Sequence, residues 1–323
     1  MRTCSVLRQF HPLWMAAFCK VASVLAMLVF QMSLPGMAQA QSPGAGSLRD
    51  EISRQDSIFQ SKGDQVPGGY SIDRTLADYV LGLSNEFDRE LAGLSAKDRW
   101  LDIGAGEGRA ILDYHAPNNG ATRPLENSDG SKASSVAISI EDRRTPAWHK
   151  RTADLGANKI QYLFGKRFGQ YDREELGKFQ LISDVLGGFS YTDNLSRFME
   201  RVLGVLETNG SFYTVLQDVG AANEANRPYY PDSRFLTEIT NADGADLKVC
   251  SWLKSISCVQ VTCELRQDWK PPIERYRVRK VCDNVSVPEL APVSYEAGTP
   301  PERRFQVRKL PPDPVKDSGG GAR

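Results

Sequence analysis

The chain has 323 residues with 40 basic and 40 acidic side chains, so its formal net charge is zero, and 41% of its residues are hydrophobic. This is the composition of an ordinary globular protein, and no basic excess points to nucleic acid or to an anionic membrane surface as a partner. The length is enough for one α/β domain with flanking extensions after an N-terminal leader.

The first 40 residues predict a secretory signal peptide. Basic residues precede the uncharged run Val21–Phe30, and the segment closes with Ala38-Gln39-Ala40, the small-x-small pattern that a signal peptidase prefers. The apolar run is too short for a comfortable membrane span. We therefore expect cleavage after Ala40 and a periplasmic or secreted protein with no stable membrane span. An uncleaved N-terminal anchor is the alternative.

The next segments predict a linker followed by the start of a folded domain. Residues 41–69 are rich in Gly, Ser, Gln and charge, and a short helix is expected within them at Leu48–Phe59. Apolar residues of Ile72–Leu94 recur at helical spacing, which predicts one helix with a single buried stripe. The apolar run Trp100–Ile103 predicts the first strand, and Glu107–His115 predicts the helix after it.

A glycine-rich loop joins this strand to this helix, in the order Asp102-Ile103-Gly104-Ala105-Gly106-Glu107-Gly108-Arg109. Glycine can take positive φ and lets a ligand approach the main chain, and the free N–H groups that start the helix face the same crevice. In the dinucleotide-binding fingerprint the third glycine stands five places after the first. That position is Arg109 here, and the third glycine comes one place earlier, at Gly108.

The Asp-x-Gly-x-Gly-x-Gly order closely resembles the first motif of the class I S-adenosylmethionine-dependent methyltransferases. In that family the loop packs against the methionine portion of the cofactor, and the acid lies near its amino group. The resemblance thus implies S-adenosylmethionine as the cofactor, with Asp102, Gly104, Ala105, Gly106 and Gly108 at its site. A glycine-rich turn without a ligand is the alternative.

The resemblance also implies a fold class. We expect an α/β domain over residues 70–284, doubly wound, with a mostly parallel sheet, helices on both faces and an antiparallel C-terminal strand pair. Residues 116–135, rich in Pro, Asn, Gly and Ser, predict a surface insertion within it.

A second strand is predicted at Val136–Ile140, and it ends in two acids, Glu141 and Asp142. A carboxylate at this strand end can accept both ribose hydroxyl hydrogens of an adenosine cofactor. Glu141 is the first choice and Asp142 the fallback, since an error of one residue in the strand end exchanges them. An ordinary solvated charge is the alternative for Glu141.

A third strand is predicted at Ile160–Phe164, and the sequence after it departs from the family pattern. Many family members place an acid or amide there against the adenine amine, whereas this chain reads Gly165-Lys166-Arg167-Phe168. A backbone group or stacking on Phe168 would have to substitute. The fourth strand also begins with Gln180 where the family pattern has an acid.

The fourth strand continues through Ser183 and Asp184, and it ends at the same sheet edge as the glycine loop. Asp184, Ser190 and Tyr191 are the polar candidates there. Asp184 is assigned to the cofactor site, and Asp184 and Tyr191 are candidates for a general base, as is His149, although no catalytic residue is singled out.

The remaining core elements follow in order. Asp193 is expected to cap a helix at Leu195–Leu206, and Asn209-Gly210 is expected to form a turn before a fifth strand at Ser211–Leu216. Residues 246–283 predict the antiparallel pair that closes the sheet.

Four cysteines lie in or beside this pair, and an even number in an exported chain suggests two disulfides. Four cysteines allow three pairings. A hairpin turning at Lys270-Pro271-Pro272 would place Cys258 nearly opposite Cys282, which favours this pair and leaves Cys250 for Cys263. Zinc is the competing interpretation, but paired Cys-x-x-Cys spacing and a nearby histidine are missing, so no metal is expected.

The proline- and glycine-rich tail, residues 285–323, is expected to be extended or disordered.

Together these features predict an exported methyltransferase that acts on a small molecule or another acceptor that the sequence does not identify. Two alternatives remain open. One is a catalytically inactive binding or scaffold protein in the periplasm, and the other, disfavoured by the early third glycine, is an NAD-linked oxidoreductase.

Overall fold

The computed structural model describes residues 73–115, 132–153, 155–156, 158–217, 236–269, 272–298 and 300–308. The predicted signal peptide, linker and Leu48–Phe59 helix lie outside the described residues, as do most of the insertion and the last part of the tail. Among the described helices, none combines the length and the apolar character needed to cross a membrane.

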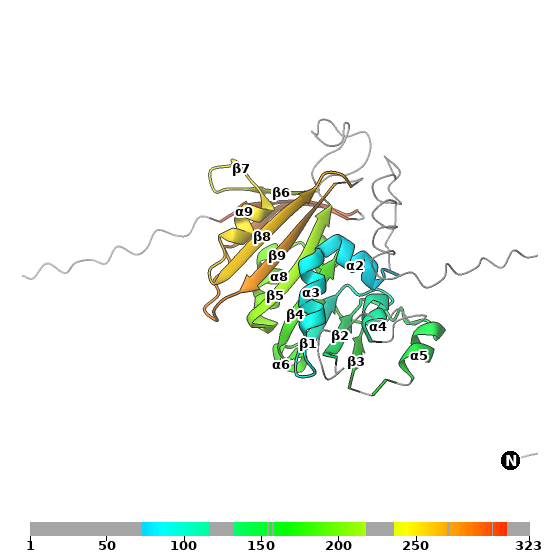
Figure 1. Ribbon diagram of the computed structural model, residues 1–323. Coiled ribbons are helices and arrows are strands. Elements are labelled where there is room, and N and C mark those ends of the chain that lie inside the picture. Colours follow the sequence, from blue (N-terminus) through cyan, green and yellow to red (C-terminus); the bar gives the residue numbers. More distant parts are fainter. Residues whose placement is uncertain are drawn as a thin grey trace, which may run out of the picture. The chain divides into compact units, whose positions relative to one another are not determined.

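Seven strands form the main sheet in the order β3-β2-β1-β4-β5-β9-β8 (Figure 1). The first five pair in parallel and the last two are antiparallel, which confirms the predicted fold class. The strands are β1 (Arg99–Ile103), β2 (Ser134–Ile138), β3 (Ile160–Leu163), β4 (Phe179–Val185), β5 (Leu206–Gln217), β8 (Val259–Arg266) and β9 (Ile273–Lys280).

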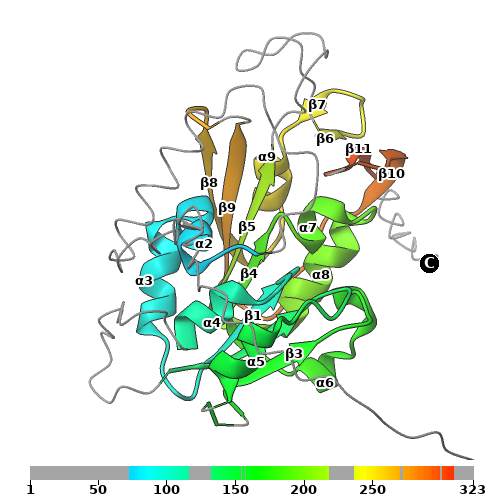
Figure 2. The same cartoon turned by 90° about the vertical axis from the view of Figure 1, so that its right-hand side faces the viewer.

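Helices cover both faces of this sheet, and Figure 2 shows α2 and α3 on one side with α7 and α8 on the other. The helices are α2 (Leu76–Leu83), α3 (Asn85–Gly93), α4 (Arg109–His115), α5 (Pro146–Thr152), α6 (Arg173–Leu176), α7 (Gly188–Tyr191), α8 (Leu195–Val205) and α9 (Val249–Lys254), with a 3-10 turn, η2, at Phe168–Gln170. Alternate side chains of β1 enter opposite cores: Trp100 packs with α2 and α3, whereas Leu101 and Ile103 pack with α8. Both faces are therefore buried.

Two details of helix ends differ from the sequence predictions. The single helix expected at Ile72–Leu94 is broken at Ser84, which has φ 146°; its Oγ accepts a hydrogen bond from the N–H of Phe87 and so starts α3. The cap of α8 is Asn194 and not Asp193, because the Asn194 side chain accepts from the N–H of Arg197 at 2.9 Å.

The predicted turn at Asn209-Gly210 lies inside β5, which runs without a break from Leu206 to Gln217. Asn209 has φ 70°, and the pairing of β4 with β5 shifts register between Phe179 and Leu181. The turn residues therefore form an irregularity within the strand: between these two pairs β5 advances from Leu206 to Ser211 while β4 advances only from Phe179 to Leu181, and the pairing resumes beyond them.

A second sheet, in the order β10-β11-β6-β7, includes part of the proline- and glycine-rich tail. It consists of β6 (Thr237–Thr240), β7 (Asp246–Leu247), β10 (Leu290–Glu296) and β11 (Glu302–Val307). Of the two expectations for the tail, extended or disordered, its described residues follow the first and form two strands. Leu290 and Phe305 enter the main hydrophobic core, and Pro292 is tolerated because β10 is an edge strand.

Two disulfides join the cysteines in the predicted pairing. Cys258 is bonded to Cys282 across the ends of the β8–β9 hairpin, with Cα atoms 5.1 Å apart. Cys250, on α9, is bonded to Cys263, on β8, with Cα atoms 6.1 Å apart. The second bond holds α9 against the outer strand of the main sheet.

Candidate functional site

The loop between β1 and α4 has the backbone geometry that its glycines permit. Gly104, Gly106 and Gly108 have φ of 76°, 56° and 72°, in the left-handed region that strongly favours glycine. The N–H groups of Gly104 and Ala105 both donate to the carbonyl of Ile138, each at 2.9 Å, which ties the loop to the end of β2. The loop is thus held in one shape at the carboxyl ends of β1 and β2.

A second glycine turn, Leu186-Gly187-Gly188 after β4, touches this loop directly. A Cβ on Gly104 would lie 2.8 Å from the Cα of Gly187, and a Cβ on Gly187 would lie 2.5 Å from the carbonyl oxygen of Ile103. Leu186 also has a positive φ, 50°, which is strained for a side chain of this kind. The Gly-Gly pair one residue after β4 is the feature of the sequence that signals this close contact.

Gly108 and Tyr162 fix the far end of the glycine loop. A Cβ on Gly108 would lie 3.1 Å from the Trp148 Nε1, so the missing side chain lets α5 pack closely. The Tyr162 hydroxyl, from β3, donates to the carbonyl of Gly106. At Gly104 and Gly108, close neighbours therefore disfavour a side chain in addition to the positive φ.

Asp102 is fully buried beneath the loop. Its two carboxylate oxygens accept hydrogen bonds from the Tyr79 hydroxyl at 2.9 Å and from the Ser183 Oγ at 2.8 Å, and Ser183 in turn accepts from the Trp100 Nε1. Burial raises the pKa of Asp102 to about 7, against the lowering effect of these hydrogen bonds. The predicted site acid thus joins α2, β1 and β4 and has no face toward solvent.

Asp184 is also fully buried, and it holds the second glycine turn. Its oxygens accept from the N–H of Gly187 and of Phe189, both at 2.9 Å. Burial raises its pKa to about 7, opposed by these two bonds. Because both oxygens are engaged by the backbone, Asp184 is placed to shape the turn and not to collect a proton from an acceptor.

The other two polar candidates after β4 lie on α7. Ser190 is buried, and its hydroxyl donates to the carbonyl of Val215 at 3.2 Å. Tyr191 is half-buried, and its carbonyl accepts from the Tyr295 hydroxyl at 3.2 Å. Of the two, only Tyr191 has a partly exposed side chain.

The two acids after β2 are exposed at the edge that carries the glycine loop, but each is paired with an arginine. The strand ends at Ile138, earlier than predicted, and Glu141 pairs with Arg143 at 2.6 Å. Asp142 accepts from Arg144 at 2.8 and 2.7 Å, and this hydrogen bonding lowers its pKa to about 2. A ribose would have to compete with one of these arginines.

Aromatic and apolar groups surround the same arginine. The Arg144 guanidinium lies over the rings of Trp148, Tyr162 and Phe164, within 5.5 Å of each centroid. Phe164 and Ile140, which follow β3 and β2, are 47% and 64% exposed. Phe168, the residue predicted to stack on adenine, is instead buried in the core, so Phe164 is the ring available at this edge.

The histidines in the described residues lie in different environments. His149 is exposed on α5, whereas His115 is buried against Ser135, and burial lowers its pKa to about 3. Within the described part of the chain, the group close enough to share an ion is Cys250, Cys263 and Glu274, and its two cysteines are disulfide-bonded.

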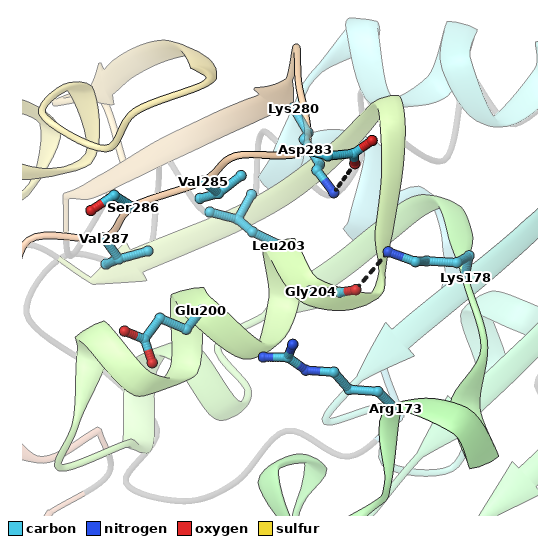
Figure 3. Close-up of a pocket in the computed structure, with 10 residues that line it drawn as sticks. All are labelled: Arg173, Lys178, Glu200, Leu203, Gly204, Lys280, Asp283, Val285, Ser286 and Val287. Atoms are coloured by element: carbon cyan, nitrogen blue, oxygen red, sulfur yellow. Dashed lines mark hydrogen bonds and ion pairs between the residues drawn. The ribbon is translucent and has the colours of Figure 1, made fainter.

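A groove of about 490 Å³ lies at the other end of the sheet, beside the start of β4 and the end of β9 (Figure 3). The Lys178 Nζ donates to the Gly204 carbonyl at 2.8 Å, and the buried Lys280 bonds the Leu206 carbonyl at 3.1 Å and Asp283 at 2.9 Å. Its lysines thus stabilise the carboxyl end of α8, and the groove is separate from the glycine loop.

No family model matches the chain, and no curated protein matches it. Solved structures with a similar arrangement include an rRNA methylase from Streptococcus thermophilus, with 14% identity, a TM-score of 0.38 and coverage of 66% of this chain and 100% of that one. Another is the N-methyltransferase NodS from Bradyrhizobium japonicum in complex with S-adenosylhomocysteine, with 12% identity, a TM-score of 0.38 and coverage of 71% and 98%.

A third is a protein described as a putative S-adenosylmethionine-dependent methyltransferase, from Listeria monocytogenes, with 15% identity, a TM-score of 0.40 and coverage of 61% and 96%. At these scores the fold assignment rests on the strand order and the glycine loop of the chain itself. By its parallel core, its antiparallel β9–β8 pair and its β1–α4 glycine loop, the chain has the predicted doubly wound, mostly parallel α/β fold with an antiparallel strand pair at one edge.

Proposed function

We propose that this protein is an exported S-adenosylmethionine-dependent methyltransferase. The observation that carries the proposal is the rigid loop from Gly104 to Gly108, with three left-handed glycines, at the carboxyl edge of a sheet with this strand order. Ligands of open α/β sheets bind outside the carboxyl ends of the strands, where the order reverses. In this sheet that position lies between β1 and β4.

The residues present fit such a cofactor in three respects. Gly106, at the centre of the loop, has a positive φ and no side chain, which lets a ligand approach its main chain more closely than another residue would. Glu141 stands exposed beyond β2, where a carboxylate can accept ribose hydroxyls after Arg143 moves away. Exposed Ile140 and Phe164 offer apolar surface for a flat base in place of the missing polar residue after β3.

Asp102 supports this site from beneath. Since its oxygens are taken by Tyr79 and Ser183, it acts by fixing the ends of β1 and β4, and any contact with a cofactor amino group would pass through another group. The same holds for Asp184, which fixes the turn at Gly187. Both carboxyls are thus positioning groups in the proposed site.

When bound, S-adenosylmethionine supplies a methyl group on a sulfonium, and the sulfur departs without charge. The protein therefore needs no acid for the leaving group, and orientation with exclusion of water can carry most of the acceleration. We assign these tasks to the glycine loop and to the turn Leu186–Gly188. Tyr191 and the exposed His149 remain candidates to receive a proton, for an acceptor that arrives protonated.

Export is the second part of the proposal. Two disulfides support it, because such bonds persist in oxidising compartments and are rare in the cytosol. The predicted signal segment at residues 1–40 points the same way. A periplasmic or secreted enzyme would need its cofactor delivered from the cytoplasm, where S-adenosylmethionine is made.

A catalytically inactive binding protein of the same fold is the second candidate. It is favoured by the pairing of Glu141 with Arg143 and of Asp142 with Arg144, which engages both ribose-binding candidates within their own loop. An NAD-linked oxidoreductase is the third candidate. It is disfavoured because the third glycine is Gly108, one place earlier than in the dinucleotide-binding fingerprint.

Calorimetry separates the methyltransferase from the oxidoreductase and from a binding protein that does not use this cofactor. We expect the purified protein to bind S-adenosylmethionine and S-adenosylhomocysteine but not NAD. Gly106→Val should abolish binding while circular dichroism stays unchanged, because the side chain fills the loop. Gly244→Val is the control, since Gly244 also has a positive φ, 85°, but has open space around it. Absence of binding at millimolar cofactor would contradict the enzyme and leave the inactive binding or scaffold protein, which uses the crevice for another ligand or for none.

A further inference from the structure

Arg303, on β11 of the second sheet, is fully buried. Burial lowers its pKa to about 10, so the guanidinium is still charged at neutral pH. Burying a charge is costly unless its donors are satisfied, so the groups that the guanidinium contacts indicate what it does.

Its guanidinium joins the second sheet to the turn after β4. The Nη1 donates to the carbonyls of Phe189 at 2.9 Å and Thr192 at 2.7 Å. The Nε and Nη2 donate to the Thr237 Oγ1, on β6, at 3.3 and 3.1 Å. These carbonyls belong to α7 and its carboxyl end, where helical carbonyls lack partners of their own.

The same turn is held from the opposite side by a buried acid. Asp184 accepts from the N–H of Phe189, while Arg303 donates to the Phe189 carbonyl, so buried side chains from two sheets bind the backbone of one residue. The Tyr295 hydroxyl, on β10, donates to the Tyr191 carbonyl. A helix of four residues is not stable alone, so these contacts determine its position.

We propose that Arg303 is a positioning residue of the cofactor site: from the second sheet it holds the turn Gly187–Thr192 against the glycine loop. The link is direct, because Gly187 touches Gly104 and the strained Leu186 precedes it. Strained turns persist only where the surrounding structure holds them. This inference rests on the proposed function, since it assigns Arg303 a part in binding the same cofactor.

The test compares Arg303→Met with Arg304→Met. Arg304 is the next residue on β11, half exposed, and it pairs with Glu238 at 2.9 Å on the surface. Two quantities are measured: the affinity for S-adenosylhomocysteine by calorimetry, and amide hydrogen exchange in residues 186–193. For Arg303→Met we expect about tenfold weaker binding and about tenfold faster exchange in the turn, whereas Arg304→Met should stay within about twofold of wild type.

Chemical rescue distinguishes positioning from a general loss of structure. In Arg303→Ala, millimolar guanidinium should restore affinity and slow exchange in the turn, since it replaces the missing donors at the two carbonyls. If Arg303→Met does not fold, Arg303→Lys takes its place. The lysine keeps the charge but cannot reach both carbonyls and Thr237, so partial loss of affinity is expected.

Unchanged amide hydrogen exchange in residues 186–193 of a folded Arg303 variant would overturn the inference. Full affinity for S-adenosylhomocysteine in Arg303→Lys would also overturn it. So would a loss of affinity in Arg303→Ala that added guanidinium does not restore. These results differ from failure of the proposed function. That failure would appear as absence of S-adenosylhomocysteine binding by the wild-type protein. The exchange measurement does not need bound cofactor, so it reports in either case whether Arg303 holds the turn.

Discussion

Gly104 and Gly187 meet backbone to backbone, so closely that a Cβ on Gly104 would lie 2.8 Å from the Cα of Gly187. The contact joins the turns that follow β1 and β4, the two strands between which the proposed cofactor lies. Each glycine is therefore needed by the other as much as by a ligand.

Gly104→Ala should destabilise the protein by about 2–4 kcal/mol, because a left-handed φ of 76° and a close contact with backbone both oppose the methyl group. Chemical denaturation measures the loss. Gly244→Ala serves as the matched control, since Gly244 has a φ of 85° and open surroundings, so it reports the φ effect alone. Equal losses in the two variants would show that the contact with Gly187 contributes nothing.

Glu141→Gln should weaken S-adenosylhomocysteine binding by about tenfold, because a carboxylate accepts two ribose hydroxyls more strongly than an amide does. Asp142→Asn should change affinity by less than about twofold, since Asp142 is engaged by two hydrogen bonds from Arg144. Calorimetry on both variants decides between the acids. The reverse order would assign the ribose to Asp142.

Asp102→Asn should become relatively more stable than wild type as pH rises from about 4 to 8. The pKa of Asp102 is raised to about 7 in the folded protein from 3.8, so its favourable contribution is complete below pH 3.8 and is lost as pH rises through 7. The relative change should approach about 4 kcal/mol at most. Asparagine keeps one acceptor and one donor for the hydroxyls of Tyr79 and Ser183.

Urea denaturation of both proteins across this pH range measures the effect. His115 has the opposite dependence, because burial lowers its pKa to about 3, but it is present in both proteins and cancels in the difference. A difference in stability that does not vary with pH would mean that Asp102 ionises normally.

Replacing Cys258 and Cys282 together by serine should lower the free energy of unfolding by about 3 kcal/mol, since the bond closes a loop with a sequence separation of 24. Replacing Cys250 and Cys263 together should lower the free energy of unfolding by slightly less, because their separation of 13 closes a shorter loop. This loss also rounds to about 3 kcal/mol. Denaturation with and without a reductant provides the comparison. Identical stability of the oxidised and reduced wild type would rule out a stabilising role.

Local pattern was enough to predict the core elements and the disulfide pairing. The glycine spacing from Gly104 to Gly108 and the apolar runs of the strands are properties of adjacent residues, and they carry over directly into the β1–α4 loop and the parallel sheet. The pairing of Cys258 with Cys282 followed from hairpin register, because the two strands are joined by a short turn.

The sequence by itself therefore determined the fold class, the glycine loop and the cysteine pairs. Only the tertiary structure decided that Asp102 and Asp184 are enclosed, that Gly187 touches Gly104, and that Arg303 reaches the turn after β4 from a segment expected to be extended or disordered. The physical reason is distance along the chain. Burial and hydrogen bonding of a side chain depend on partners contributed by remote segments, whereas periodicity and glycine spacing depend on neighbours alone.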